Sequence, residues 1–274
     1  MRRRLSVGYA AMVAGLLILG LMMVVPYLWM VLSSLKSNAE ILSAHSTILP
    51  RHPTLAGFNM VLTQAPFFRW LWNSLITSTI ITAVTLFTSA ISGYIFAKFE
   101  FRAKKVLFFT LLASMMVPFA VVMIPTYLIV ARMGIVDHLS SIVVPSLISA
   151  FGIFLCRQFI ESLPRDLLEA ARIDGAGEFR IFAAIVVPQI RPVMSALGIF
   201  TFMAAWNNYL WPLIVLNDID RMTVPLALVF FNGRHLQNWN VVMSAGVLIM
   251  VPVLVVFFIF QKQFVKGLTL TGLK

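Results

Sequence analysis

The charged side chains with spacing suited to chemistry lie in one segment, residues 161–191, which holds five of the chain's ten acidic residues. A short helix is predicted there over residues 165–173. Ala170 and Ala171 would give it a smooth face, with Glu169 at the edge of that face. Small side chains let another backbone approach closely, and a carboxylate can pair with a cation. This pattern indicates recognition of another protein.

Local signals set the expected limits of this segment. Ser162 is a suitable N-cap, and Pro164 is tolerated in a first turn because its missing N–H needs no partner there. Gly175 is expected in a left-handed conformation that ends the helix. A second helix is predicted from about Glu178 to Pro188, which breaks it. The apolar positions of the first helix are Leu167, Leu168, Ala171 and Ile173.

The residues allow a second interpretation of this segment. A helix–turn–helix could lie on the bilayer surface, with Glu169 paired internally to Arg165 or Arg172 at helical spacing. Partner docking and surface packing therefore both remain open from the residues alone.

Signatures of catalysis and of metal binding are lacking in the sequence. It contains no G-x-x-x-x-G-K-[ST] segment for nucleotide phosphates and no H-E-x-x-H segment. Cys156 is the single cysteine, and the histidines lack metal-ligand spacing; they are His45, His52, His138 and His235. We therefore expect a protein that is not an enzyme and binds no cofactor or metal.

The composition indicates whether water or lipid surrounds the elements that must position this loop. The 274 residues are 60% hydrophobic and 11% charged, whereas soluble domains carry about 25% charged residues. The net charge of +11 is spread over short segments between long apolar runs, which is the pattern of membrane topology and not of a nucleic-acid-binding face. The chain is predicted to be an integral membrane protein.

Six apolar stretches satisfy, or nearly satisfy, the length of about 20 residues needed to cross a bilayer. The predicted architecture is a single all-α domain, residues 1–274, with a cytoplasmic loop at residues 161–192. The first stretch exceeds the apolar core of a signal peptide, so we expect it to remain uncleaved. Residues 222–233 are too short to span and are predicted to be interfacial or re-entrant. The spans are expected at about 9–32, 72–96, 106–130, 141–160, 193–216 and 241–262.

Basic residues set the orientation. With both termini inside, fifteen of the 21 Lys and Arg residues lie on the cytoplasmic side. The six external ones would be Lys36, Arg51, Arg69, Arg132, Arg221 and Arg234.

The five longest apolar stretches contain no Asp, Glu, Lys or Arg. Ion-coupled carriers usually need ionisable groups at membrane depth. The energy for any transport is therefore expected to arrive through the loop, although a stand-alone secondary carrier is the alternative.

Two groups of polar residues are candidates for a solute path. A stripe along the second span includes Ser78, Thr82 and Thr85, and its preferred interpretation is helix packing through hydroxyl groups. Asn207 and Asn208 lie beside Trp206, and amides next to aromatic rings suit sugar recognition. This second group could equally lie at the outer mouth and contact another protein. Pro118 and Pro125 are expected to kink the third span.

The loop resembles the coupling-loop signature of the inner-membrane subunits of binding-protein-dependent ABC importers, which reads EAA, three residues, G, nine residues, I-x-L-P. Val187 replaces the usual leucine, and the EAARIDGA form is similar to the carbohydrate-importing branch. Similar segments include GYIFAKFEFRAKK at 93–105 and TFMAAWNNYLWPL at 201–213. One departure is Asn208 where the branch usually has Asp. The matching residues are Glu169, Ala170, Ala171, Asp174, Gly175, Ala176, Ile185 and Pro188.

The resemblance implies a type I ABC importer permease fold in a bacterial inner membrane and a carbohydrate substrate, with a glycerol-phosphate ester as the alternative. It implies a second homologous permease subunit, a dimeric cytoplasmic ATPase that uses ATP and Mg²⁺, and an extracytoplasmic solute-binding protein. Glu169 would pair with a basic residue of the ATPase, and Ala170, Ala171 and Gly175 would permit the fit. The tail at residues 266–274 would be a second, weaker contact.

Overall fold

The computed structural model describes residues 7–44, 47–234 and 238–272. Every regular element in these residues is helical, which confirms the predicted all-α class. The chain divides into two compact units. The first comprises Met1–Phe67 with Ala227–Pro252, and the second comprises Phe68–Leu226 with Val253–Lys274.

The first unit joins the end of the first helix to the start of the last one. The Asn240 side-chain amide donates to the backbone carbonyls of Ser34 at 3.0 Å and Lys36 at 2.5 Å. Asn240 is buried, so these bonds replace water at a helix end. The helices of this unit are α1 (Val7–Ser34), α2 (Asn38–Leu42), α3 (Ala56–Gln64), α14 (Ala227–Arg234) and the first part of α15 (Trp239–Gly272).

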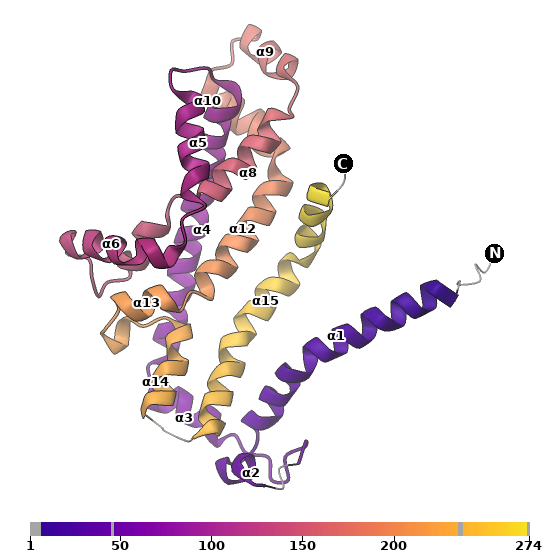
Figure 1. Ribbon diagram of the computed structural model, residues 1–274, viewed down its shortest axis with the longest axis vertical. Helices are drawn as coiled ribbons and strands as arrows, with labels where there is room; N and C mark the ends of the chain where they lie inside the picture. The colour runs from indigo at the N-terminus through magenta and orange to yellow at the C-terminus, as the bar shows by residue number, and fades with distance from the viewer. Residues whose placement is uncertain (1–6, 45–46, 235–237, 273–274) are drawn as a thin grey trace. The chain divides into compact units, whose positions relative to one another are not determined.

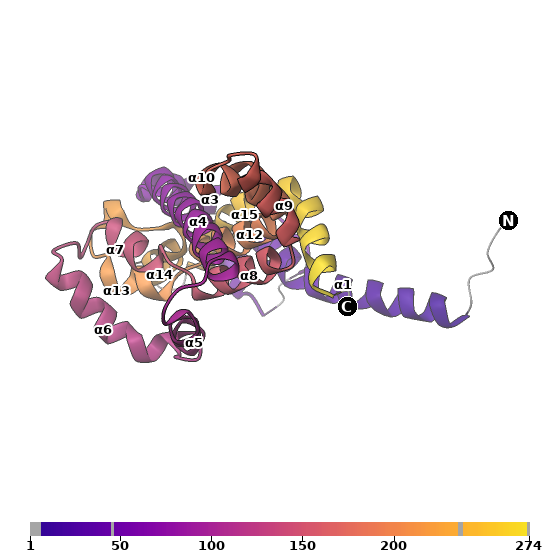
Figure 2. The ribbon, with the colours of Figure 1, turned by 90° about the horizontal axis from the view of Figure 1, so that it is seen from above.

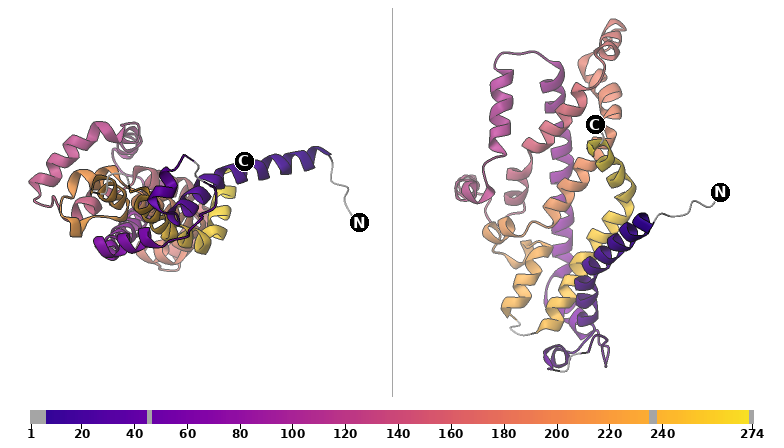
Figure 3. Two further views of the ribbon diagram at one scale, coloured as in Figure 1. Left: turned by 90° about the horizontal axis from the view of Figure 1, so that it is seen from below. Right: turned by 45° about the vertical axis from the view of Figure 1, so that its right-hand side comes forward.

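The second unit holds the predicted loop. Figure 1 shows α9 and α10 near one end of α4, and Figure 3 shows α5 returning beside α4. In Figure 2, α6 turns away from α5. The elements are α4 (Phe67–Lys98), α5 (Lys104–Ser114), α6 (Phe119–Arg132), α7 (Ser140–Val143), η1 (Val144–Ser146), α8 (Ala150–Glu161), α9 (Arg165–Ile173), α10 (Glu178–Ile181), the π-helical turn η2 (Phe182–Val186), α11 (Val187–Gln189), α12 (Arg191–Trp206), α13 (Leu210–Val215), η3 (Ile219–Arg221), η4 (Val224–Leu226) and the end of α15.

Small residues bring α4 and α8 into close contact. A Cβ atom on Gly93 would lie 2.7 Å from the Cβ of Cys156 and 2.9 Å from the backbone nitrogen of Arg157. A Cβ on Gly152 would lie 2.3 Å from the hydroxyl oxygen of Ser89. Small residues of this kind let membrane helices pack closely and gain van der Waals contact. Gly93 and Ser89 therefore serve the packing of α4 on α8 at this end of the helix.

In the part of the chain that the structure describes, four helices are long and apolar enough to cross a membrane, and up to six spans result if each of two bent pairs counts as one. The third span predicted over residues 106–130, with a kink at Pro118, is divided into α5 and α6, and the bend of 104° between them is far larger than a kink. Pro118 has no N–H to continue a helix and becomes the N-cap of α6. Pro125, by contrast, lies inside α6.

The fifth predicted span, residues 193–216, is also interrupted. α12 ends at Trp206, and α13 begins at Leu210. The 16 residues of α12 extend about 24 Å, less than the roughly 30 Å of a hydrocarbon core. Residues 222–233 form η4 and part of the eight-residue α14, which is likewise short.

The helix that begins at Glu178 ends at Gln189, one residue after Pro188, so the predicted break before α12 is present. The backbone N–H of Val187 bonds to the Phe182 carbonyl, five residues back, so the helix widens into a π turn just before the proline. A π turn accommodates the missing N–H and the bulk of a proline ring. The direction changes by 77° only after Gln189.

The segment between α13 and α14 is fastened to the start of α4. The Asn73 side-chain amide donates to the carbonyls of Asp220 at 3.0 Å and Met222 at 2.9 Å. The hydroxyl of Ser74 accepts from the backbone N–H of Val224 at 2.8 Å. Asn73 and Ser74 therefore have a structural role.

Asp137 binds the beginning of the segment that follows α13. Its backbone is left-handed, with φ of 62°, and its carboxylate accepts from the N–H groups of Asn217 at 2.8 Å and Asp218 at 2.9 Å. These backbone hydrogen bonds, with the nearby Arg221 guanidinium, lower the pKa of the Asp137 carboxyl. The charged form is the one that binds these donors.

Candidate functional site

The predicted helix of the loop is present as α9, Arg165–Ile173. Gly175 has φ of 81°, which confirms the left-handed stop. Its N–H donates to the Arg172 carbonyl at 3.0 Å, and the N–H of Ala176 donates to the Ala171 carbonyl at 2.9 Å. This pair of bonds is a Schellman motif, which satisfies the last carbonyls of the helix.

The predicted N-cap is wrong. The hydroxyl of Ser162 donates to the Phe159 carbonyl at 2.7 Å, so Ser162 closes α8. Pro164 occupies the N-cap position of α9 with no side-chain capping bond. The two-residue gap between α8 and the proline leaves Ser162 on the earlier helix.

One apolar residue anchors α9 to the rest of the second unit. Leu168 is 1% exposed and packs in a core that contains Tyr94, Ile160 and Ile181. Ala171 and Ala176 are half-buried against the same core.

The opposite side of the loop is open and forms what we call the coupling face. It is made of Glu169, Ala170, Ile173, Asp174, Gly175 and Phe179, which are all exposed. Ile173 and Phe179 are 86% and 74% exposed, so the face carries apolar side chains beside a carboxylate. Ile173 was predicted as one of the apolar positions of the helix, whereas the exposed Phe179 was not among the residues predicted for this site.

Glu169 is available for an external partner. In the described part of the chain its carboxylate forms no ion pair, although it lines a small depression of about 100 Å³ with Lys98, Arg165 and Arg172. Arg172 instead pairs with Glu178, with 2.7 Å between Nε and Oε1. The alternative in which Glu169 pairs internally with Arg165 or Arg172 is therefore not observed.

The carboxylate of Glu178 accepts hydrogen bonds from two other side chains. It accepts from Arg172 and from the hydroxyl of Tyr94, the latter at 2.7 Å. The hydrogen bond from Arg172, followed by that from Tyr94, lowers the pKa of the Glu178 carboxyl. Glu178 is therefore ionised at neutral pH.

The second half of the motif lies away from the coupling face. Ile185 is half-buried and packs against the apolar core, and Pro188 is also half-buried. In this structure these two residues shape the π turn and the bend that follow the loop.

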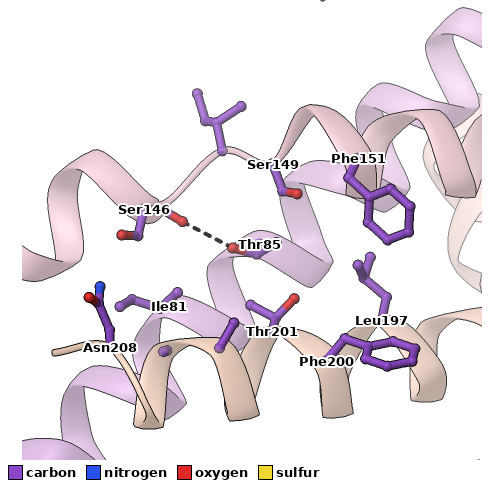
Figure 4. A pocket seen from close by; sticks show the side chains of 12 residues that line it. Ile81, Thr85, Ser146, Ser149, Phe151, Leu197, Phe200, Thr201 and Asn208 are labelled. Atoms are coloured by element: carbon purple, nitrogen blue, oxygen red, sulfur yellow. Dashed lines mark hydrogen bonds between the residues drawn. The ribbon is translucent and has the colours of Figure 1, made fainter. Parts of the chain in front are cut away.

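A cavity of about 380 Å³ lies among α4, α12 and the segment between η1 and α8. We call it the α4–α12 cavity. Figure 4 shows Asn208 and Ser146 at one end, with Phe151, Leu197 and Phe200 at the other. Its lining mixes hydroxyl and amide groups with aromatic and aliphatic side chains, and none of the described lining residues is charged.

Two polar side chains of this cavity are open to a ligand. The Thr201 hydroxyl and the Asn208 amide have no side-chain hydrogen bond within the described residues, whereas Thr85 donates to the Ser146 carbonyl at 3.2 Å. Thr201 lies on α12, whereas Asn208 lies two residues beyond the end of that helix at Trp206. Asn208 was predicted from the sequence, but Thr201, Ser146 and Ser149 were not, because no helical spacing links them to it.

Of the six predicted path residues, Asn208 and Thr85 line this cavity. Ser78 and Trp206 are buried, and their polar atoms find no partner among the described residues. The Asn207 amide bonds back to the Met203 carbonyl at 2.9 Å. Thr82 bonds to the Ser78 carbonyl and lines a different, mainly apolar cavity of about 320 Å³.

Metal ligation has little support in the described residues, because no three His, Cys, Asp or Glu side chains meet there. His45 and His235 lie outside the described residues. The two other histidines, His52 and His138, are both exposed.

Known proteins resemble this chain in both sequence and fold. The family described as "Binding-protein-dependent transport system inner membrane component" matches residues 89–270. The arabinooligosaccharides transport system permease protein AraQ of Bacillus subtilis (strain 168) is 33% identical, over 98% of this chain and 97% of that protein. The sn-glycerol-3-phosphate transport system permease protein UgpE of Escherichia coli O1:K1 / APEC is 33% identical, over 84% of each. A solved bacterial ABC transporter involved in the import of the acidic polysaccharide alginate has the same fold, with a TM-score of 0.82 at 24% identity over 96% of this chain and 99% of that one.

Proposed function

This chain belongs to the family of binding-protein-dependent transport system inner membrane components, and from that premise we propose that it is a permease subunit of an ATP-driven carbohydrate importer. It forms half of a translocation path and receives energy from a cytoplasmic ATPase through α9 and the coupling face. The single observation that carries this proposal is Glu169, an exposed carboxylate with no ion pair among the described residues, on a helix whose other side is anchored.

The coupling face suits a cleft in a partner protein. Ala170 and Gly175 allow close approach of a second backbone, and Glu169 offers a charge-assisted bond to a basic residue. Ile173 and Phe179 supply apolar area that would leave water on docking. The exposed Asp174 extends the face, and the half-buried Ala171 and Ala176 hold it on the core.

The α4–α12 cavity favours a neutral polyhydroxylated solute. Thr201 and Asn208 offer free hydrogen-bonding groups, and Phe151 and Phe200 offer apolar faces. Such a mixture suits sugar rings, which carry hydroxyl groups around an apolar face. A phosphate ester would favour cations such as Arg or Lys, and the described lining has none. Carbohydrate is therefore the better candidate, with a glycerol-phosphate ester as the alternative.

Further subunits follow from this assignment. The importer would contain a second homologous permease subunit, an ATPase dimer that binds ATP and Mg²⁺, and an extracytoplasmic solute-binding protein. The N- and C-termini would be cytoplasmic, as the distribution of basic residues favours. Residues 266–274 would lie on the ATPase side; residues 273–274 and the preceding side chains lie outside the part that the structure describes.

The test is ATP-dependent uptake by the complex that co-purifies with the tagged chain, reconstituted in proteoliposomes. A panel of oligosaccharides and glycerol phosphate is supplied with the solute-binding protein. We expect uptake of a carbohydrate only when ATP and all subunits are present. Uptake by the chain alone would instead establish a secondary carrier.

Glu169→Lys tests the coupling face. Reversal of this charge removes the charge-assisted bond and introduces repulsion, so we expect uptake and co-purification of the ATPase to fall together. Asp166→Lys is the matched control, because Asp166 is an exposed acid of the same helix. Equal uptake by Glu169→Lys and the unsubstituted complex would exclude this role for Glu169.

A further inference from the structure

One carboxylate of the loop contacts two different helices. Glu178 is the first residue of α10 and accepts 2.7 Å hydrogen bonds from Arg172 and from Tyr94. Arg172 lies in the last turn of α9, and Tyr94 lies on α4. A single side chain therefore bridges the end of α9 and the long apolar helix α4.

Tyr94 is held firmly at its end of this bridge. Its side chain is buried, and its ring meets Phe99 edge-on at 5.4 Å and Phe182 at 5.6 Å between centroids. Thr85, which lines the α4–α12 cavity, lies nine residues earlier on the same helix. That separation is about 14 Å along the helix axis.

The other attachments of the loop are of a different kind. Leu168 makes apolar contacts, which have no preferred direction. Lys98 donates to the Leu163 carbonyl at 2.7 Å, before α9 begins. The hydrogen bonds of Glu178 join α9 to α4 through directional, charge-assisted contacts.

We propose that Glu178 is a positioning residue that transmits the movement of α9 to α4, with Arg172 and Tyr94 as its two contacts. The proposal rests on the proposed function, because it assigns a path for the energy that the coupling face receives. When an ATPase moves α9, the ion pair carries Glu178 with it. The hydrogen bond to Tyr94 then draws α4 and the wall of the α4–α12 cavity.

A merely structural role has a different signature. If the bridge only holds the loop in its fold, its loss lowers complex assembly, ATP hydrolysis and uptake in parallel. If it transmits movement, its loss leaves ATP hydrolysis in place and lowers the amount of solute moved per ATP. The ratio of uptake to hydrolysis therefore separates the two roles.

Tyr94→Phe is the first test, because it removes the hydroxyl and keeps the ring packing on Phe99 and Phe182. In the complete reconstituted importer we expect normal assembly, and a fall of at least about fivefold in solute moved per ATP, the lower end of usual coupling effects. Tyr127→Phe is the matched control, because the Tyr127 hydroxyl has no bond among the described residues and lies outside the loop. An unchanged ratio in Tyr94→Phe would overturn the proposal.

Charge reversal gives the second test. Arg172→Glu and Glu178→Arg should each lower the ratio, and the double variant should restore it, since the ion pair re-forms and the Tyr94 hydroxyl can accept from an arginine. Arg102→Glu, an exposed reversal in the turn after α4, should leave the ratio unchanged. A double variant as impaired as its parents would show that the bridge does not act as a pair.

The unsubstituted complex separates this proposal from the proposed function. If that complex hydrolyses ATP but moves no carbohydrate, the proposed function fails. If it moves carbohydrate, and Tyr94→Phe, Arg172→Glu and Glu178→Arg all retain its ratio of uptake to hydrolysis, only the proposal for Glu178 is refuted.

Discussion

The turn that closes α9 gives a prediction whose size follows from the backbone. Gly175 has φ of 81°, and a Cβ atom added there would meet nothing within 4 Å. Gly175→Ala therefore adds no clash, and its cost is the left-handed conformation itself. That conformation costs an alanine about 1–2 kcal/mol.

The substitution would therefore destabilise the Schellman motif, which fixes the direction of the chain between α9 and Glu178. A change of about 1–2 kcal/mol shifts an equilibrium by about 5- to 30-fold. We expect Gly175→Ala to increase the frayed form of the turn by this factor and to lower solute uptake. Gly175→Asn should be milder, because asparagine tolerates the left-handed region.

The chain contains a matched control for this substitution. Gly134 follows α6 with φ of 70° and equal open space, and its neighbour Ile135 donates to the Val130 carbonyl in the same motif. Gly134→Ala should lower the melting temperature of the complex to a similar degree but spare uptake per folded complex. Equal losses of uptake in the two variants, or none with Gly175→Ala, would refute the reasoning.

Three further predictions concern stability, measured by thermal unfolding in detergent. Gly93→Ala should lower the melting temperature, because overpacking against Cys156 and Arg157 costs about 1–3 kcal/mol and exceeds the helix-propensity gain of about 1 kcal/mol; a rise would contradict the packing of α4 on α8. Ala103→Gly should raise it by relieving a φ of 63°, worth about 1–2 kcal/mol, and no rise would argue against that backbone. Asp137→Asn tests the lowered pKa of Asp137: the ionised carboxylate stabilises the fold above about pH 4, and this contribution is lost as the pH falls toward the folded pKa. The difference from the unsubstituted chain should therefore shrink from about pH 6 to pH 3, and a constant difference would refute the assignment.

The sequence predicted features that depend on local chemistry. The predicted range of α9 and the left-handed Gly175 are confirmed, and both follow from the backbone sterics of Pro164 and Gly175, whereas the predicted cap at Ser162 is not present. The apolar lengths of α1 and α4 likewise needed no knowledge of neighbours.

Features set by tertiary contacts could not be predicted. The 104° bend before α6 required the conformation around Pro118, and a proline alone also permits a mild kink or, as at Pro125 inside α6, a continued helix. Glu178 meets Tyr94 across 84 residues of sequence, which no local spacing reveals. The exposed part of the site was therefore predicted best, and its contacts with the rest of the chain were predicted least.

The central claim is that the coupling face lies in the cytoplasm under an ATPase, and labelling of Ala170→Cys tests it most directly. Ala170 is exposed and the native Cys156 is buried, so a membrane-impermeant thiol reagent should report the new residue. We expect labelling in inside-out vesicles stripped of ATPase, protection when the ATPase is bound, and no labelling in right-side-out vesicles. Labelling from the external side alone would contradict the account.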